Sequence, residues 1–122
     1  MGRQEVFDKI IDELSHIEGS EGAAIVGTDG MIIASKLDKK YAQDKIAALI
    51  SHAVNTATKV ITEAALGKPD TISIEGTEGK IVLMHSEKAK VFIFVIGSKD
   101  MNLGLVRMML DEAVEDFDET IG

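Results

Sequence analysis

The sequence feature that most restricts the fold is a run of six apolar residues, Val91-Phe92-Ile93-Phe94-Val95-Ile96. Successive side chains of a strand point to opposite faces of its sheet, so a strand that is apolar at every position needs cover on both faces. We therefore expect this run to be the central strand of a sheet, with helices packed on each side.

Stripes of apolar residues at three- and four-residue spacing predict a helix near each end of the chain. One stripe runs from Val6 to Ile17 and the other from Leu103 to Ile121. Ser98 and Asp100 both precede the second stripe, and both are residue types that cap helix N-termini.

A longer helix is predicted in the middle of the chain, from about Tyr41 to Leu66. This segment has neither Gly nor Pro, and Gly67 and Pro69 then supply the usual signals for a helix to stop. At 3.6 residues per turn the helix would span about seven turns.

The remaining apolar runs predict four more strands and complete the order α-β-β-α-β-β-β-α. They are Ala23–Thr28, Met31–Lys36, Thr71–Glu75 and Lys80–His85. Asp29-Gly30, between the first two, favours a tight hairpin turn. A chain of 122 residues suits one core. We therefore predict a single domain over residues 1–122, an α+β sandwich built on a five-stranded antiparallel sheet.

Charge and composition exclude several classes of function. The net charge of −8 opposes binding to nucleic acid or to an anionic membrane surface. The chain has no cysteine, no apolar leader at its N-terminus and no apolar run long enough to span a membrane. We expect a cytoplasmic protein that does not insert into membranes.

No motif for catalysis, metal binding or cofactor binding emerges from the sequence. Gly67-Lys68 is followed by Pro69 where a phosphate loop needs Ser or Thr. His16, His52 and His85 fall on different predicted elements and lack metal-ligand spacing. There is no Gly-x-Ser-x-Gly elbow. We predict no catalytic, cofactor-binding or metal-ligating residue, and so no enzyme.

The middle helix has two contrasting faces when its residues are placed 100° apart. One half is apolar, and we assign it to the domain's own sheet: Ile46, Ala47, Leu49, Ile50, Ala53, Val54, Ala57, Val60, Ile61 and Ala64. The other half carries Ser51, His52, Asn55, Thr56, Thr58, Lys59, Thr62 and Glu63. That half is poor in the charged helix formers of an exposed surface, which favours a protein contact, although an ordinary solvated surface is the alternative.

The last helix gives weaker hints. Leu105 and Met108 fall on its acid-rich side, where exposed apolar pairs can mark a second partner site. We expect Arg107 to pair with Asp111, four residues on, rather than to reach a nucleotide bound by another protein. The acidic residues near the C-terminus are interpreted as a solvated helix face.

Three motifs, taken with the order of elements, resemble the Roadblock family, and the match covers nearly the whole chain. They are Ile17-x-Gly19-x-x-Gly22-Ala23, Asp29-Gly30 followed by Ile32-x-Ala34-Ser35, and Asn102-Leu103-Gly104-x-x-Arg107. Gly27 departs from the pattern, since a larger residue, often Asp, is expected there. The family includes a dynein light chain and regulators of Ras-like GTPases.

The resemblance implies a Roadblock/profilin-like fold and a homodimer in which the strands Thr71–Glu75 pair edge to edge while the middle helices lie side by side. The implied dimer or partner interface comprises Ser51, His52, Asn55, Thr58, Lys59, Thr62, Thr71, Ile72, Ser73 and Ile74. It also implies a non-enzymatic platform that binds and regulates a small Ras-like GTPase. A scaffold subunit of a motor or membrane-associated complex is the main alternative, and a small-molecule sensor is a third. Pairing with a different Roadblock chain stays open.

Overall fold

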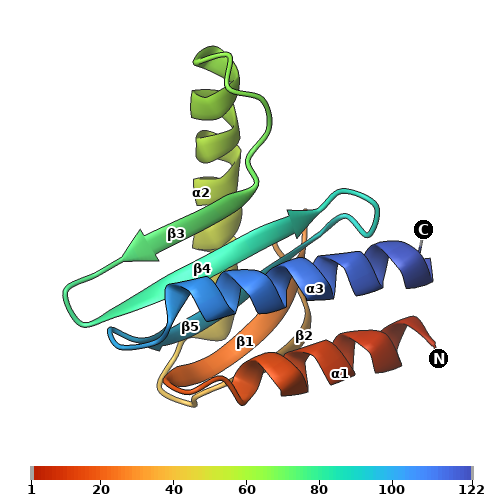
Figure 1. The fold of residues 1–122 in the computed structure, drawn as a ribbon, viewed down its shortest axis with the longest axis vertical. Helices are drawn as coiled ribbons and strands as arrows, with labels where there is room; N and C mark the ends of the chain where they lie inside the picture. Colours follow the sequence, from red (N-terminus) through yellow and green to blue (C-terminus); the bar gives the residue numbers. More distant parts are fainter. Residues whose placement is uncertain (1, 122) are drawn as a thin grey trace.

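The structure is a computed structural model that describes residues 2–121, apart from the side chain of residue 121. Its elements follow the predicted order (Figure 1). They are α1 (Arg3–Ser15), β1 (Ser20–Gly27), β2 (Ile32–Leu37), α2 (Gln43–Glu63), β3 (Thr71–Glu75), β4 (Gly79–Ser86), β5 (Val91–Ser98) and α3 (Leu103–Ile121). None of these helices is long and apolar enough to cross a membrane.

The five strands form one antiparallel sheet in the order β2-β1-β5-β4-β3. The apolar run Val91–Ile96 lies in β5, at the centre, and every one of its residues is buried. The prediction of a central strand is therefore confirmed. β2 and β3 are left as the two edge strands.

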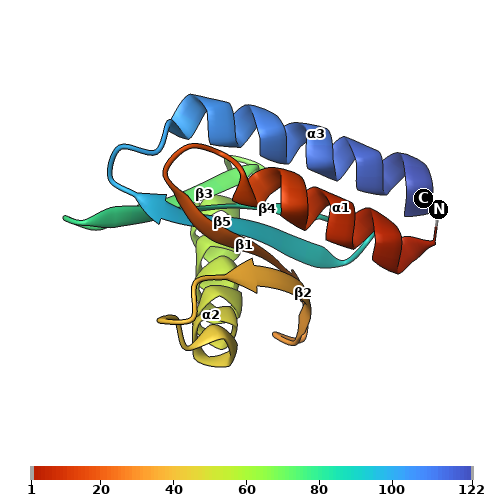
Figure 2. The same cartoon turned by 90° about the horizontal axis from the view of Figure 1, so that it is seen from below.

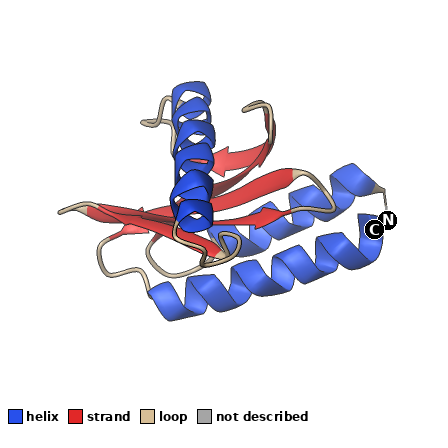
Figure 3. Ribbon diagram, turned by 90° about the horizontal axis from the view of Figure 1, so that it is seen from above, coloured by secondary structure: helices blue, strands red, loops and turns tan. Residues whose placement is uncertain are grey.

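Helices cover both faces of the sheet, as expected from that run. α1 and α3 lie side by side on one face and α2 crosses the other (Figures 2 and 3). The face under α1 and α3 holds the larger core, in which the rings of Phe7 and Phe117 meet edge to face with centroids 4.9 Å apart. The smaller core under α2 includes Ile50, Val54 and Phe94.

α2 is longer than the sheet that it crosses. Its 21 residues span about 31 Å, whereas five strands spaced by about 4.8 Å are about 19 Å wide. The C-terminal part of α2 consequently extends beyond β3 (Figure 1). Among the described residues of α2, only Ala47, Ile50 and Val54 are fully buried.

Several predicted boundaries differ from the structure: β1 begins at Ser20 rather than Ala23, for example, and β4 spans Gly79–Ser86 rather than Lys80–His85. Three of the differences have a clear local cause. α2 ends at Glu63, before Gly67, because Ala65 adopts a left-handed conformation at φ 58° and Leu66 donates to the carbonyl of Ile61.

The cap of α3 was predicted at Ser98 or Asp100, which is wrong. Asn102 caps the helix, since its Oδ1 accepts a hydrogen bond from the Leu105 amide at 2.9 Å. The β1–β2 connection is also longer than a two-residue turn: it runs from Thr28 to Met31 and follows a bulge at Ile25/Val26.

Candidate protein–protein interface

β3 is an edge strand whose outer side has no neighbouring strand in the described part of the chain. Its backbone pairs with β4 on one side only, from Thr71 opposite Met84 to Glu75 opposite Lys80. Ser73, Ile74 and Glu75 are exposed, and the Ile74 side chain keeps 44% of its surface in solvent. An open edge with apolar exposure is a template for pairing with another strand.

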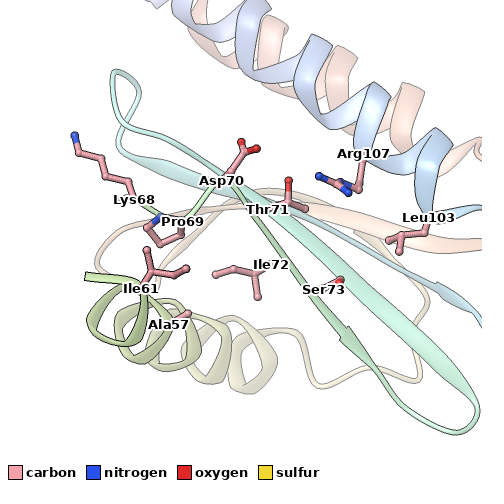
Figure 4. Close-up of a pocket in the computed structure, with 10 residues that line it drawn as sticks. All are labelled: Ala57, Ile61, Lys68, Pro69, Asp70, Thr71, Ile72, Ser73, Leu103 and Arg107. Carbon is pink, nitrogen blue, oxygen red and sulfur yellow. The ribbon is translucent and has the colours of Figure 1, made fainter. Parts of the chain in front are cut away.

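A groove of about 350 Å³ follows this edge, with walls from α2 and α3 (Figure 4). Its lining residues are Ala57, Ile61, Lys68, Pro69, Asp70, Thr71, Ile72, Ser73, Leu103 and Arg107. The groove is therefore lined by residues of α2 on one face of the sheet and of α3 on the other, with β3 between them. Sequence patterns assigned Ala57, Ile61 and Leu103 to the core but carried no signal for a groove.

One side of α2, which we call the apolar flank, is left largely uncovered. It comprises Leu49, Ala53, Ala57, Val60 and Ala64. Leu49, Val60 and Ala64 are exposed, and Ala53 and Ala57 are half-buried. The expectation that the whole apolar half packs on the domain's own sheet is wrong for the exposed three. Val60 and Ala64 lie toward the end of α2 that extends past β3, whereas Leu49 is exposed because it lies on the side of the helix while its neighbour Ile50 faces the sheet.

The opposite side of α2, which we call the polar flank, comprises Ser51, His52, Asn55, Lys59 and Thr62. It faces the end of the sheet where β1 turns into β2, since a side chain built on Gly30 would meet Ala48 and Ser51. Ser51 is half-buried there, while His52, Asn55, Lys59 and Thr62 are exposed. The two flanks thus point toward opposite ends of the strands.

Thr58 differs from the other polar residues in the predicted interface. Its hydroxyl donates a hydrogen bond to the carbonyl of Val54 at 2.8 Å. It also lines a small cavity with Pro69, Ile72 and His85, which places it above the domain's own sheet. Its hydroxyl is therefore already satisfied within the helix.

Comparison with known proteins identifies the family of this chain. A family model for the Roadblock/LC7 domain matches residues 6–97. The chain belongs to the Roadblock/LC7 family. The uncharacterized protein MJ1340 of Methanocaldococcus jannaschii is 30% identical over 110 residues, which cover 90% of this chain and 95% of that protein.

Solved structures confirm the fold of this Roadblock/LC7 domain. MglB of Myxococcus xanthus superposes with a TM-score of 0.85 at 17% identity, over 98% of this chain and 96% of that one. An MglB solved in a tetrameric arrangement gives a TM-score of 0.84 at 13% identity, over 99% and 92% of the two chains. The predicted Roadblock fold is thereby confirmed.

The second predicted patch of this Roadblock/LC7 domain lies on α3. Leu105 and Met108 are both exposed, to 38% and 52%. Arg107 lies between them in sequence but lines the groove beside β3 (Figure 4). In the described residues it forms no ion pair with Asp111, so that predicted pair is absent.

Two titratable groups near the α2–β3 connection have shifted pKa values. Burial lowers the pKa of the His85 imidazole, which stacks on Phe92 with ring centroids 4.9 Å apart. Lys68 pairs with Glu87 at 3.0 Å and holds the pKa of that carboxyl below its usual range. Residues 2–121 contain no cluster of three or more side chains suited to holding a metal ion.

Proposed function

We propose that this Roadblock/LC7 domain is a homodimeric, non-enzymatic platform that binds and regulates a small Ras-like GTPase. One observation carries the dimer: the groove along the open edge of β3 is also lined by Ala57 of the apolar flank, whose neighbours Val60 and Ala64 are exposed. Each feature alone is a weak sign of an interface. Together they leave a strand and a helix without partners on the same side of the domain.

In the proposed dimer the two β3 strands pair antiparallel, so that one sheet of ten strands runs through both subunits. The overhanging part of α2 then lies over the twin's sheet, beside the twin's α2. α2 passes β3 near Ile72, and its apolar flank points along the strand toward Glu75. In the proposed pairing the twin's α2 lies on that Glu75 side, so the apolar flank faces it. Its alanines, Ala53, Ala57 and Ala64, permit a close approach of the two helices.

This arrangement changes the assignment of the polar flank. It points away from the proposed dimer axis, so His52, Asn55, Lys59 and Thr62 stay accessible after the two subunits pair. We assign this surface to the GTPase. Short polar side chains supply adaptable hydrogen bonds without the cost of burying many charges.

Regulation would follow from differential binding. A platform that binds one nucleotide state of the GTPase more tightly shifts the population toward that state, by no more than the difference in its two affinities. The family resemblance supports a GTPase as the partner, and the same surface could serve assembly alone. A change in nucleotide turnover distinguishes the two roles.

The test uses the purified full chain and a small Ras-like GTPase from the same genome. Light scattering should give twice the monomer mass of 13.1 kDa. Calorimetry should detect binding, and hydrolysis or exchange should change when the chain is added. Binding with unchanged turnover selects the scaffold role. A monomer, or a chain that binds no such GTPase in either nucleotide state, contradicts the proposal.

A further inference from the structure

We infer that Arg107 forms an ion pair with Glu75 of the partner subunit across the β3–β3 junction, and that this pair fixes the register and selects a copy of the same chain as partner. The inference rests on the proposed dimer. It adds which residues set its alignment and its specificity.

The register follows from the geometry of antiparallel strands. Two residues directly opposite each other either exchange both backbone hydrogen bonds or exchange none. These two kinds of pair alternate along the strands, and a two-fold axis must exchange pairs of the same kind. The axis between identical strands must therefore place some residue opposite its own copy. Only an axis at Ser73 pairs all five residues of Thr71–Glu75, with Thr71 opposite the partner's Glu75.

The side chains of Thr71, Ser73 and Glu75 share one face of β3, because side chains alternate along a strand. That face is the one covered by α3: Glu75 approaches Lys80 at 3.9 Å, and Lys80 donates to the carbonyl of Met101 just before α3. A two-fold axis perpendicular to the sheet keeps this face on the same side in both subunits. The partner's Glu75 thus arrives on the α3 side, opposite Thr71.

Arg107 extends from α3 into the groove at that position, where it lines the wall together with Thr71 (Figure 4). Within the described chain it makes neither an ion pair nor a side-chain hydrogen bond. Asp70 lines the same groove but is not within ion-pair distance of it. The guanidinium therefore lacks a partner in the monomer, and the second subunit supplies a carboxylate.

Thr71 and Glu75 can both take a further partner, since Lys80 approaches Glu75 only to 3.9 Å. Among the buried side-chain atoms that the structure describes, the Oγ1 of Thr71 has no hydrogen-bond partner, which is costly for a hydroxyl closed off from water. Glu75 keeps 61% of its side chain in solvent. In the proposed register these groups and Arg107 meet twice, once on each side of the axis.

Other registers lose this arrangement. An axis at Ile72 sets Glu75 opposite the partner's Pro69, which has no amide hydrogen to donate. An axis at Ile74 sets Thr71 opposite the partner's Thr77 and leaves Arg107 without a carboxylate. A partner chain lacking this acid or this arginine would lose one of the two ion pairs, and a chain lacking both residues would lose the two, so the pairing favours identical chains.

The test is a charge exchange between two variants of the full chain. Glu75→Arg places two arginines at each junction of its homodimer, and Arg107→Glu places two acids there. Each variant alone should dimerise with a Kd raised about tenfold or more, since two attractive pairs become repulsive. Mixed in equal amounts, the two variants restore both ion pairs. Native mass spectrometry should then show the mixed dimer in excess of both homodimers.

Glu115→Arg, an equal charge change on the far part of α3, serves as the control and should leave the dimer unchanged. Rescue only on mixing separates a contact between subunits from damage to the fold, because damage would persist in the mixture. A wild-type dimer that neither variant weakens overturns this inference and leaves the proposed dimer standing. Weakened variants that mixing does not rescue overturn it too. A monomeric wild type overturns the proposed function itself.

Discussion

The two faces of the sheet are built differently. Among the described residues, the core under α1 and α3 contains twenty buried apolar side chains, while the core under α2 contains nine. Two helices lie along one face, whereas a single helix crosses the other and extends past β3 (Figures 1 and 2). The helix on the second face is left partly uncovered in the single chain.

This difference separates stability from assembly. Burial of apolar surface supplies most of the folding free energy, so the α1/α3 face should dominate the stability of the monomer. The α2 face keeps Leu49 and Val60 more than half exposed, which contributes little to folding but provides surface for association. Substitutions on the two faces should therefore affect different measurements.

The largest effect is expected from Phe117→Ala. Phe117 is fully buried on the α1/α3 face against Phe7, so the substitution should lower the free energy of unfolding by about 3–5 kcal/mol. Urea unfolding of dilute protein measures this. Val60→Ala on the exposed apolar flank is the matched control and should change it by less than about 0.5 kcal/mol. Similar losses of unfolding free energy for both variants would contradict the proposed difference between the two faces.

Val60→Glu should weaken the dimer and leave the stability of the monomer nearly unchanged. Val60 is 61% exposed in the monomer, so its replacement should leave the fold intact. In the dimer the new carboxylate would be buried against the twin's α2 without a partner, which should raise the dimer Kd roughly a hundredfold. Sedimentation velocity over a concentration series measures the change. Thr62→Glu adds the same charge to the polar flank, and a dimer weakened equally by it would argue against the proposed assignment of the flanks.

Charging the polar flank more strongly sharpens the comparison within α2 itself. Asn55→Glu combined with Thr62→Glu should keep a folded dimer, because both residues are exposed and point away from the proposed axis. Binding of the GTPase should weaken about tenfold or more if this surface is its site. Calorimetry with the wild-type dimer as reference gives the ratio. Unchanged binding would reduce the polar flank to ordinary surface.

The sequence predicted the fold well because its strongest signals are local. The six apolar residues from Val91 required a central strand, and the bounds of β3 were predicted as they stand in the structure. The helix ends were harder. Ala65 takes a left-handed conformation that its residue type disfavours, and three polar residues near α3 could each have capped it.

The candidate site was predicted only in part, for a geometric reason. Periodicity gives the angle of a residue around the helix axis but does not tell where along the axis the sheet ends. Ile50 and Ile61 point in similar directions, yet Ile50 is buried while Ile61 borders the groove at β3. Val60 and Ala64 were assigned to the core for the same reason. The groove itself needs three elements distant in sequence, and no local pattern contains that information.

The smallest expected effect concerns His85, which lies on β4 beneath α2. Burial lowers the pKa of its imidazole from the ordinary value of 6.5, so the folded state favours the neutral ring. The resulting stability is present above about pH 6.5 and is lost as the pH falls through the lower pKa of the folded state. Urea unfolding should therefore give a free energy that declines between about pH 7 and pH 5, and His85→Gln should remove part of that slope. Arg3→Gln, a substitution on α1 at the other face of the sheet, should keep it. An unchanged slope in His85→Gln would assign the pH dependence to other groups and show that the α2 face carries no proton-linked stability at this position.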